Sequence, residues 1–164
     1  MPRPCFLSRL AGTAAAVATT ALMATAQCSP ATFATPADSP GCGNCEMSNR
    51  QGGNTTLPRL GTSFSVEITA VAYADPFWLL GAASLSASAL PSPPFLAGCN
   101  SYLGSGAAVL YSSVALNFGP ISAGFSIPND PALCGATLYL QATVQDHHTL
   151  ESRTSNLGVA VLGI

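Results

Sequence analysis

The sequence has no lysine, and charged residues make up only 7% of its 164 positions. Ordinary soluble domains carry about a quarter charged residues, so serine, threonine, asparagine and glutamine must cover most of this surface. After the first 26 residues, three arginines face seven carboxylates. Such a surface cannot neutralise a row of phosphates, which argues against nucleic-acid binding and against docking to anionic lipid. It also leaves few groups for acid–base catalysis.

The common catalytic motifs are absent as well. The sequence contains no G-x-S-x-G nucleophile elbow and no glycine-rich loop that opens a helix and cradles phosphate. The carboxylates that a glycoside hydrolase would pair are better explained as surface or turn residues. Glu67 lies on the polar face of an expected strand, Asp75 and Asp130 precede prolines, and Glu151 falls in an expected loop. We therefore predict no catalytic residues, no cofactor and no enzymatic activity.

One segment places a carboxylate beside imidazoles, namely Asp146-His147-His148. Adjacent residues on a strand point to opposite faces, so two such histidines share a metal ion only in a loop. A turn is expected here after a strand at 137–145, which favours a solvated loop without a metal. The alternative is a hydrolase or metal site near residues 146–148, completed by Glu67 or Glu151.

No apolar run is long enough for a membrane span, which takes about 20 residues. The longest run, residues 10–23, follows Arg3 and Arg9 and precedes the small residues 24–26. This is the pattern of a cleaved secretory signal peptide over residues 1–26, and it predicts a mature chain that begins at Gln27. A lipoprotein is the alternative because of Cys28, but lipid attachment requires a small residue before the cysteine and Gln27 stands there.

Five cysteines follow the predicted cleavage site, and in an exported chain disulfides are the expected state. The candidates are Cys28, Cys42, Cys45, Cys99 and Cys134. Their odd number requires one thiol that is free, modified or bonded to another chain, and the connectivity does not follow from spacing. Half of a zinc site or a redox CxxC at positions 42–45 is the alternative. No second close cysteine pair completes a zinc ribbon, and no βαβ unit surrounds the motif.

Residues 27–58 and residues 59–164 differ in character. The first segment is rich in proline, glycine, serine and threonine and shows no periodicity, so we expect a loop-rich leader that contains three cysteines. From residue 64, Phe64, Val66 and Ile68 alternate with polar residues, which predicts a half-buried strand. Residues 137–145 alternate in the same way. Residues 77–85 read as a buried strand in which Gly81 marks a bulge or a close approach, with Trp78 in the core.

Further short β-favouring stretches occur at 107–112, 114–118, 121–127 and 157–161, while the proline-rich residues 89–94 are a connection or an edge. Turn signals separate these stretches every 8 to 12 residues, and no amphipathic helix is evident. The sequence therefore predicts an all-β fold, an antiparallel β-sandwich of about seven or eight short strands.

The C-terminal half carries a recognisable order of motifs. Residues 126–133 are followed by Gly135, by residues 138–142 and by residues 154–158, and in the first half Gly41-Cys42 and Gly98-Cys99 stand at corresponding points. Over about residues 41–164 the chain resembles a secreted bacterial domain of unknown function that occurs alone or at the C-terminus of exported proteins. The resemblance implies an all-β module and no catalytic residues to carry over.

The resemblance also bears on the cysteines, because the family more often has an apolar residue at the position of Cys134. This departure puts a simple Cys42–Cys99 pair in doubt. We expect Cys99 to bond within the N-terminal cysteine cluster. We expect Cys134 to be buried and reduced, or bonded to Cys45.

We predict a secreted, non-enzymatic structural or binding protein of the bacterial envelope or exterior. The alternative is a carbohydrate-binding module that stacks sugar rings on exposed tyrosines, of which Tyr139, on the polar side of its strand, is the candidate. The expected partners are envelope components, glycans or further copies of the chain. Self-association is expected because exposed edges of a nearly uncharged sandwich invite strand pairing.

Overall fold

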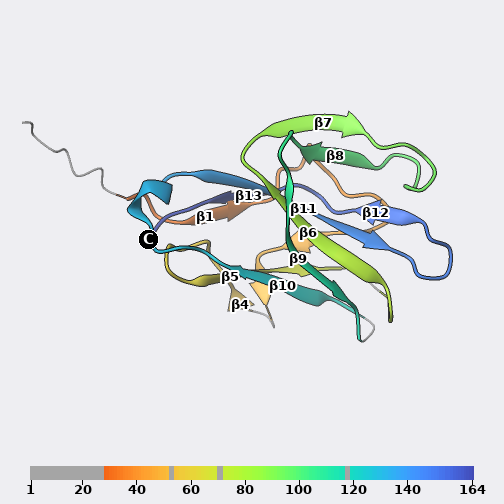
Figure 1. The fold of residues 1–164 in the computed structure, drawn as a ribbon, viewed down its shortest axis with the longest axis horizontal. Helices are drawn as coiled ribbons and strands as arrows, with labels where there is room; N and C mark the ends of the chain where they lie inside the picture. The colour runs from red at the N-terminus through yellow and green to blue at the C-terminus, as the bar shows by residue number, and fades with distance from the viewer. Residues whose placement is uncertain (1–27, 52–53, 70–71, 117–118) are drawn as a thin grey trace, which may run out of the picture.

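The computed structural model describes residues 28–51, 54–69, 72–116 and 119–164 (Figure 1). The predicted signal peptide lies outside the described residues. Within them the chain forms short strands and a single 3-10 turn, η1 (Pro131–Leu133), so the predicted all-β class is confirmed. No helix among the described residues is long and apolar enough to cross a membrane.

The strands form two main sheets and two small ribbons, and all paired strands are antiparallel. The larger sheet has the order β1 (Thr32–Ala34), β13 (Gly158–Val161), β11 (Thr137–Gln145), β6 (Pro76–Ala82) and β9 (Ala108–Val114), with β12 (Ser152–Thr154) paired to β11. The smaller sheet has the order β10 (Ile121–Ser126), β5 (Ser63–Ile68) and β2 (Met47–Ser48). The ribbons are β3 (Arg50–Gln51) with β4 (Asn54–Thr55), and β7 (Leu85–Ala89) with β8 (Asn100–Leu103).

The core lies between the two main sheets. Phe64, Val66 and Ile68 of β5 are fully buried, as their alternation predicts. They belong to one apolar cluster with Leu79 of β6 and Leu140 of β11 from the opposite sheet. Period-two alternation on both sheets therefore places one apolar face of each against the other, which is the arrangement of a β-sandwich.

The N-terminal segment is part of this sandwich. It was expected to be loop-rich, and its three-residue strand β1 pairs with β13 while its two-residue strand β2 pairs with β5. Met47 of β2 is buried in the core, and Phe33 of β1 packs against it. These strands are too short to show a period in the sequence, and their pairing partners, not their local pattern, hold them in place.

Strand β6 differs from the expectation at Trp78. Phe77 and Leu79 point into the core, so Trp78 and Leu80 point to the outer face of the larger sheet, and both are half-buried there. The prediction that Trp78 lies in the core is therefore wrong. Gly81 does mark a close approach, since a Cβ at this position would lie 2.5 Å from Leu110 Cδ1 of β9.

Two disulfides attach the N-terminal segment to the rest of the chain. Cys28 bonds to Cys134 just after η1, and Cys42 bonds to Cys99 before β8. The expectation that Cys99 joins the N-terminal cluster is confirmed, whereas the expected fate of Cys134 is wrong. Among the described residues the free cysteine is Cys45, which is buried in the main core. The disulfides are consistent with an oxidising environment.

Candidate functional site

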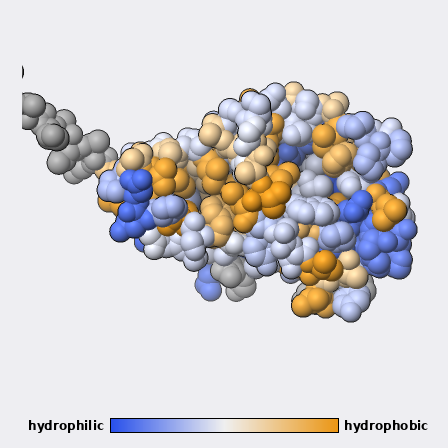
Figure 2. Space-filling model, in the orientation of Figure 1, coloured by the Kyte–Doolittle hydropathy of each residue, from blue (hydrophilic) through white to orange (hydrophobic). Residues whose placement is uncertain are grey.

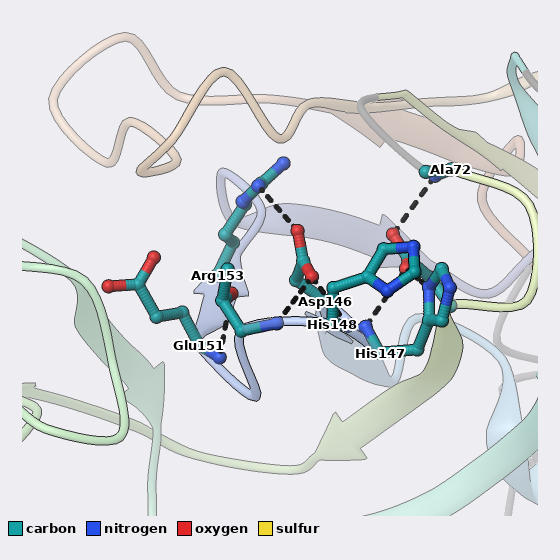
Figure 3. Close-up of polar contacts among 8 residues, drawn as sticks. Ala72, Asp146, His147, His148, Glu151 and Arg153 are labelled. Carbon is teal, nitrogen blue, oxygen red and sulfur yellow. Dashed lines mark hydrogen bonds and ion pairs between the residues drawn. The ribbon is translucent and has the colours of Figure 1, made fainter.

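The segment Asp146-His147-His148 opens the turn between β11 and β12, as expected (Figure 3). Asp146 Oδ1 accepts hydrogen bonds from the backbone N–H groups of His148 and Thr149, at 2.8 and 2.9 Å. Asp146 Oδ2 lies 3.6 Å from Arg153 Nη2. The side chain of Asp146 therefore shapes the turn from within, in the manner of an Asx turn.

His147 is held by a carboxylate that is distant in sequence. Asp75 precedes β6, and its side chain is only 2% exposed. Asp75 Oδ1 accepts hydrogen bonds from His147 Nδ1, at 2.9 Å, and from the His147 backbone N–H, at 3.2 Å, while Oδ2 accepts one from the Ala72 backbone N–H at 3.0 Å. We call these three hydrogen bonds the Asp75 clasp. The clasp joins the turn before β6 to the turn after β11.

The electrostatics of both carboxyls follow from their donors. Burial raises the pKa of Asp75, but hydrogen bonds from the His147 ring and from the Ala72 and His147 backbones outweigh it, so the pKa lies below its ordinary value. The backbone N–H groups of Thr149 and His148 lower the pKa of Asp146, and the Arg153 guanidinium adds to this effect. Both carboxylates are therefore ionised at neutral pH.

In the described part of the chain, Asp75, Asp146 and His147 are also the residues that could hold a metal ion, because one ligand atom from each lies within 4.8 Å of the others. Their donor atoms are already engaged, however. Asp75 accepts three hydrogen bonds, and Asp146 accepts two and faces a guanidinium. A metal ion would have to displace the His147 Nδ1 proton and compete with Arg153, so the geometry favours a structural contact between two turns.

The other acidic residues of the alternative site do not join this cluster. Glu67 lies on β5, where Val66 and Ile68 on either side point into the core, so its side chain faces away from the larger sheet. Glu151 lies in the same turn as His147, but its carboxylate points away from Asp146 (Figure 3). The structure therefore brings Asp75 and Asp146 to His147, and leaves Glu67 and Glu151 apart.

Of the four tyrosines, only Tyr73 is exposed, at 52%, so several exposed tyrosines do not share one surface. Tyr139 is half-buried and packs, with Leu80, against a second apolar cluster beneath the β7–β8 ribbon. Tyr102 belongs to that cluster and donates its hydroxyl hydrogen bond to the Pro40 carbonyl at 3.0 Å. Tyr111 packs against Phe77, with ring centroids 5.8 Å apart.

Trp78 was expected in the core and lies on the outer face of the larger sheet. Its neighbours on the adjacent strands are Ser112 of β9 and Thr143 of β11. These three residues project from the same face of the sheet, because paired residues of neighbouring strands share a face. The partly exposed Trp78 indole, flanked by two hydroxyl groups, is therefore an aromatic feature that a ligand could contact, and Tyr73, at 52% exposed, is another.

Two depressions lie elsewhere on the surface. One of about 580 Å³ is lined by the N-terminal loops around Pro36 and Glu46 together with Asn156. One of about 290 Å³ lies between β9 and β10, where Tyr111 and Leu116 face Ile121. Neither gathers the carboxylates and histidine of the Asp75 clasp.

Comparison of the chain with models of known families, with curated proteins and with solved structures finds no match. The resemblance to a secreted bacterial domain stays a prediction. Any function for this protein must therefore be inferred from its own structure.

Proposed function

We propose that the protein is an exported, non-enzymatic structural or binding module of the cell envelope or exterior, and that it binds through one uncharged side. The observation that carries the proposal is the charge distribution. From residue 76 to residue 129 the sequence contains no aspartate, glutamate, arginine, lysine or histidine. These residues form β6 to β10, including the whole β7–β8 ribbon.

The exposed part of this stretch is extensive. Every residue of β7 is exposed, and most of β9 is exposed as well. Figure 2 shows most of the strongly hydrophilic residues at the two ends of the view, with mainly pale and apolar residues between them. We call the exposed residues of β7 and β9 the uncharged side.

The remaining features support a rigid exported module. The two disulfides and the Asp75 clasp fasten loops to the sandwich, which limits their movement. Disulfides are maintained in oxidising compartments, in agreement with the predicted signal peptide. The ionised groups near His147 are occupied in holding two turns together, so a catalytic role finds no support in their geometry.

The test is retention of the exported protein on isolated envelope material. Mass spectrometry of the exported chain should find a mature N-terminus near Gln27 and the two disulfides. Retention should change little between about 50 and 500 mM salt, because screening acts on charges and the binding side has none. Ala87→Glu in β7 should reduce retention, whereas the matched control Thr149→Glu, in the charged β11–β12 turn, should not. A chain that stays in the cytoplasm, or retention equally affected by both variants, would contradict the proposal.

A neutral glycan is the second candidate ligand, and Trp78 is the observation that favours it. Aromatic side chains on a flat sheet face can stack on sugar rings, and Ser112 and Thr143 supply hydroxyl groups beside the indole. Trp78→Ala should abolish retention in affinity electrophoresis with neutral polysaccharides, whereas the half-buried Tyr139→Phe should not change it. Equal migration of wild type and Trp78→Ala in every polysaccharide gel would remove this candidate.

A further inference from the structure

Strand β9 is an edge that lacks the usual protection against pairing. It hydrogen-bonds to β6 on one side and ends the larger sheet on the other. Natural edge strands are commonly guarded by lysine, proline or inward-pointing charge. The β9 sequence Ala-Val-Leu-Tyr-Ser-Ser-Val has none of these, and Val114 and Leu116 are 48% and 82% exposed. A free edge of this kind is a template for another strand.

The backbone groups available at this edge follow from strand alternation. Ala115 N–H donates to the Asp75 carbonyl and Ala115 C=O accepts from Ala74 N–H, so Ala115 faces β6. Ser113 also faces β6, because hydrogen-bonding direction alternates along an antiparallel strand. Ser112 and Val114 must then direct their N–H and C=O groups outward. The Val114 carbonyl accepts a long contact of 3.5 Å from the Ser113 hydroxyl.

We propose that the occupant of this edge is a second copy of the chain, whose β9 pairs antiparallel with the first across a two-fold axis at Ser113. This deepens the proposed function, on which it rests, by naming the partner of one part of the uncharged side. The two-fold register places Ser112 of each copy opposite Val114 of the other. All four outward-facing residues then form hydrogen-bonded pairs, which gives four backbone hydrogen bonds between the copies.

The self-pairing register shifted toward the start of β9 is poorer. A two-fold axis at Ser112 would pair Val114 with Leu110, and Leu110 lies at the irregularity where the β6 register shifts between Leu79 and Leu80. A bulge disrupts regular pairing at such a point. The axis at Ser113 keeps the irregularity out of the paired segment. This axis also places the exposed apolar C-terminal end of β9, with Val114 and Leu116, beside the N-terminal end of the partner's β9.

Charge favours a second copy over other partners. The uncharged side contributes no ionised group on either copy, so two copies approach without repulsion although the whole chain is acidic. The adjoining depression, lined by Val114, Leu116 and Ile121, is likewise free of charged residues. A single edge pair buries less area than a standard protein interface, so we expect a weak dimer that forms at high protein concentration.

The test uses the two-fold position itself. The wild-type exported chain should rise from monomer toward dimer mass in sedimentation equilibrium between about 10 μM and 1 mM. Ser113→Lys and Ser113→Glu each place two like charges directly opposite, and each should weaken dimerisation about threefold. A one-to-one mixture of the two variants should restore dimerisation, because it pairs lysine with glutamate. This recovery separates the pairing from any effect on folding.

Cysteine cross-linking checks the register. Residues opposite each other in a non-hydrogen-bonded pair have Cα atoms about 4.5 Å apart, within the range of a disulfide. Ser113→Cys should therefore give a covalent dimer under mild oxidation, whereas the matched control Ser112→Cys should give little. A wild type that stays monomeric at 1 mM, or variants that fail to restore each other, overturns the proposal. Envelope retention that persists in such a monomer would leave the proposed function intact.

Discussion

Replacing Asp75 with asparagine tests whether the Asp75 clasp holds the two turns together. An asparagine can accept with its oxygen, but its amide group then faces either the Ala72 N–H or the two His147 donors. At least one donor is left facing another donor in a site where the residue is 2% exposed. A hydrogen bond to a charged group contributes about 1.5–3 kcal/mol, so Asp75→Asn should lower the free energy of unfolding by about 2 kcal/mol.

The effect should depend on pH in a defined direction. The pKa of Asp75 is lowered in the folded chain, so the clasp contributes fully above the unfolded carboxyl pKa of about 3.9. That contribution is lost as pH falls through the lower folded-state pKa, because between the two pKa values the unfolded chain binds more protons than the folded chain. Urea unfolding at pH 7 and at a series of pH values below about 4 measures the difference in the free energy of unfolding between wild type and Asp75→Asn. We call this difference the stability gap.

The stability gap should narrow toward zero in acid. The exposed control Asp38→Asn should have the same free energy of unfolding as the wild type at every pH. A gap that is absent at pH 7, or that stays constant into acid, would refute the assignment of the clasp to an ionised Asp75.

Three further predictions concern the core and the cysteines. Phe64→Ala removes a fully buried ring between the two sheets and should cost about 3–5 kcal/mol in urea unfolding. Burial raises the pKa of the Cys45 thiol to about 12. Iodoacetamide at pH 8 should therefore leave Cys45 unmodified in the native protein and label it after denaturation, because the thiolate is the reactive form. Rapid labelling of the native protein would contradict this prediction. Joint replacement of Cys28 and Cys134 by serine opens a loop of 106 residues and should lower stability by about 4–5 kcal/mol in the chain-entropy estimate, measured by the same urea transition.

The strands that the sequence predicts well are those with one polar face. In β11 the bounds agree with residues 137–145, because Leu140 and Val144 alternate with polar neighbours. In β6 every residue from Phe77 to Leu80 is apolar, so no alternation reveals which side chains point inward. Only the packing of the smaller sheet against Phe77 and Leu79 decides that Trp78 faces outward.

Long-range contacts explain the remaining differences. Nothing near Asp75 in the sequence indicates His147, since the two are brought together by the order of strands in the larger sheet. The pairing of Cys28 with Cys134 likewise depends on β1 lying beside β13. No pattern near Cys134 in the sequence indicates Cys28, so the expected alternatives, a reduced thiol or a bond to Cys45, were wrong.

Asp75 connects the clasp to the proposed dimer edge. Its side chain holds His147, and its backbone carbonyl accepts a hydrogen bond from Ala115 N–H at 3.0 Å, directly after β9. Loosening the turn before β6 should therefore also loosen the end of β9 that carries Val114. Hydrogen exchange followed by mass spectrometry should show faster exchange in Asp75→Asn at Ala115 and at His147, with no change in β5 amides such as Val66, because local opening precedes global unfolding. If exchange rose at His147 but not at Ala115, the turn would hold the β11–β12 loop alone, and the free edge of β9 would owe its position to its pairing with β6.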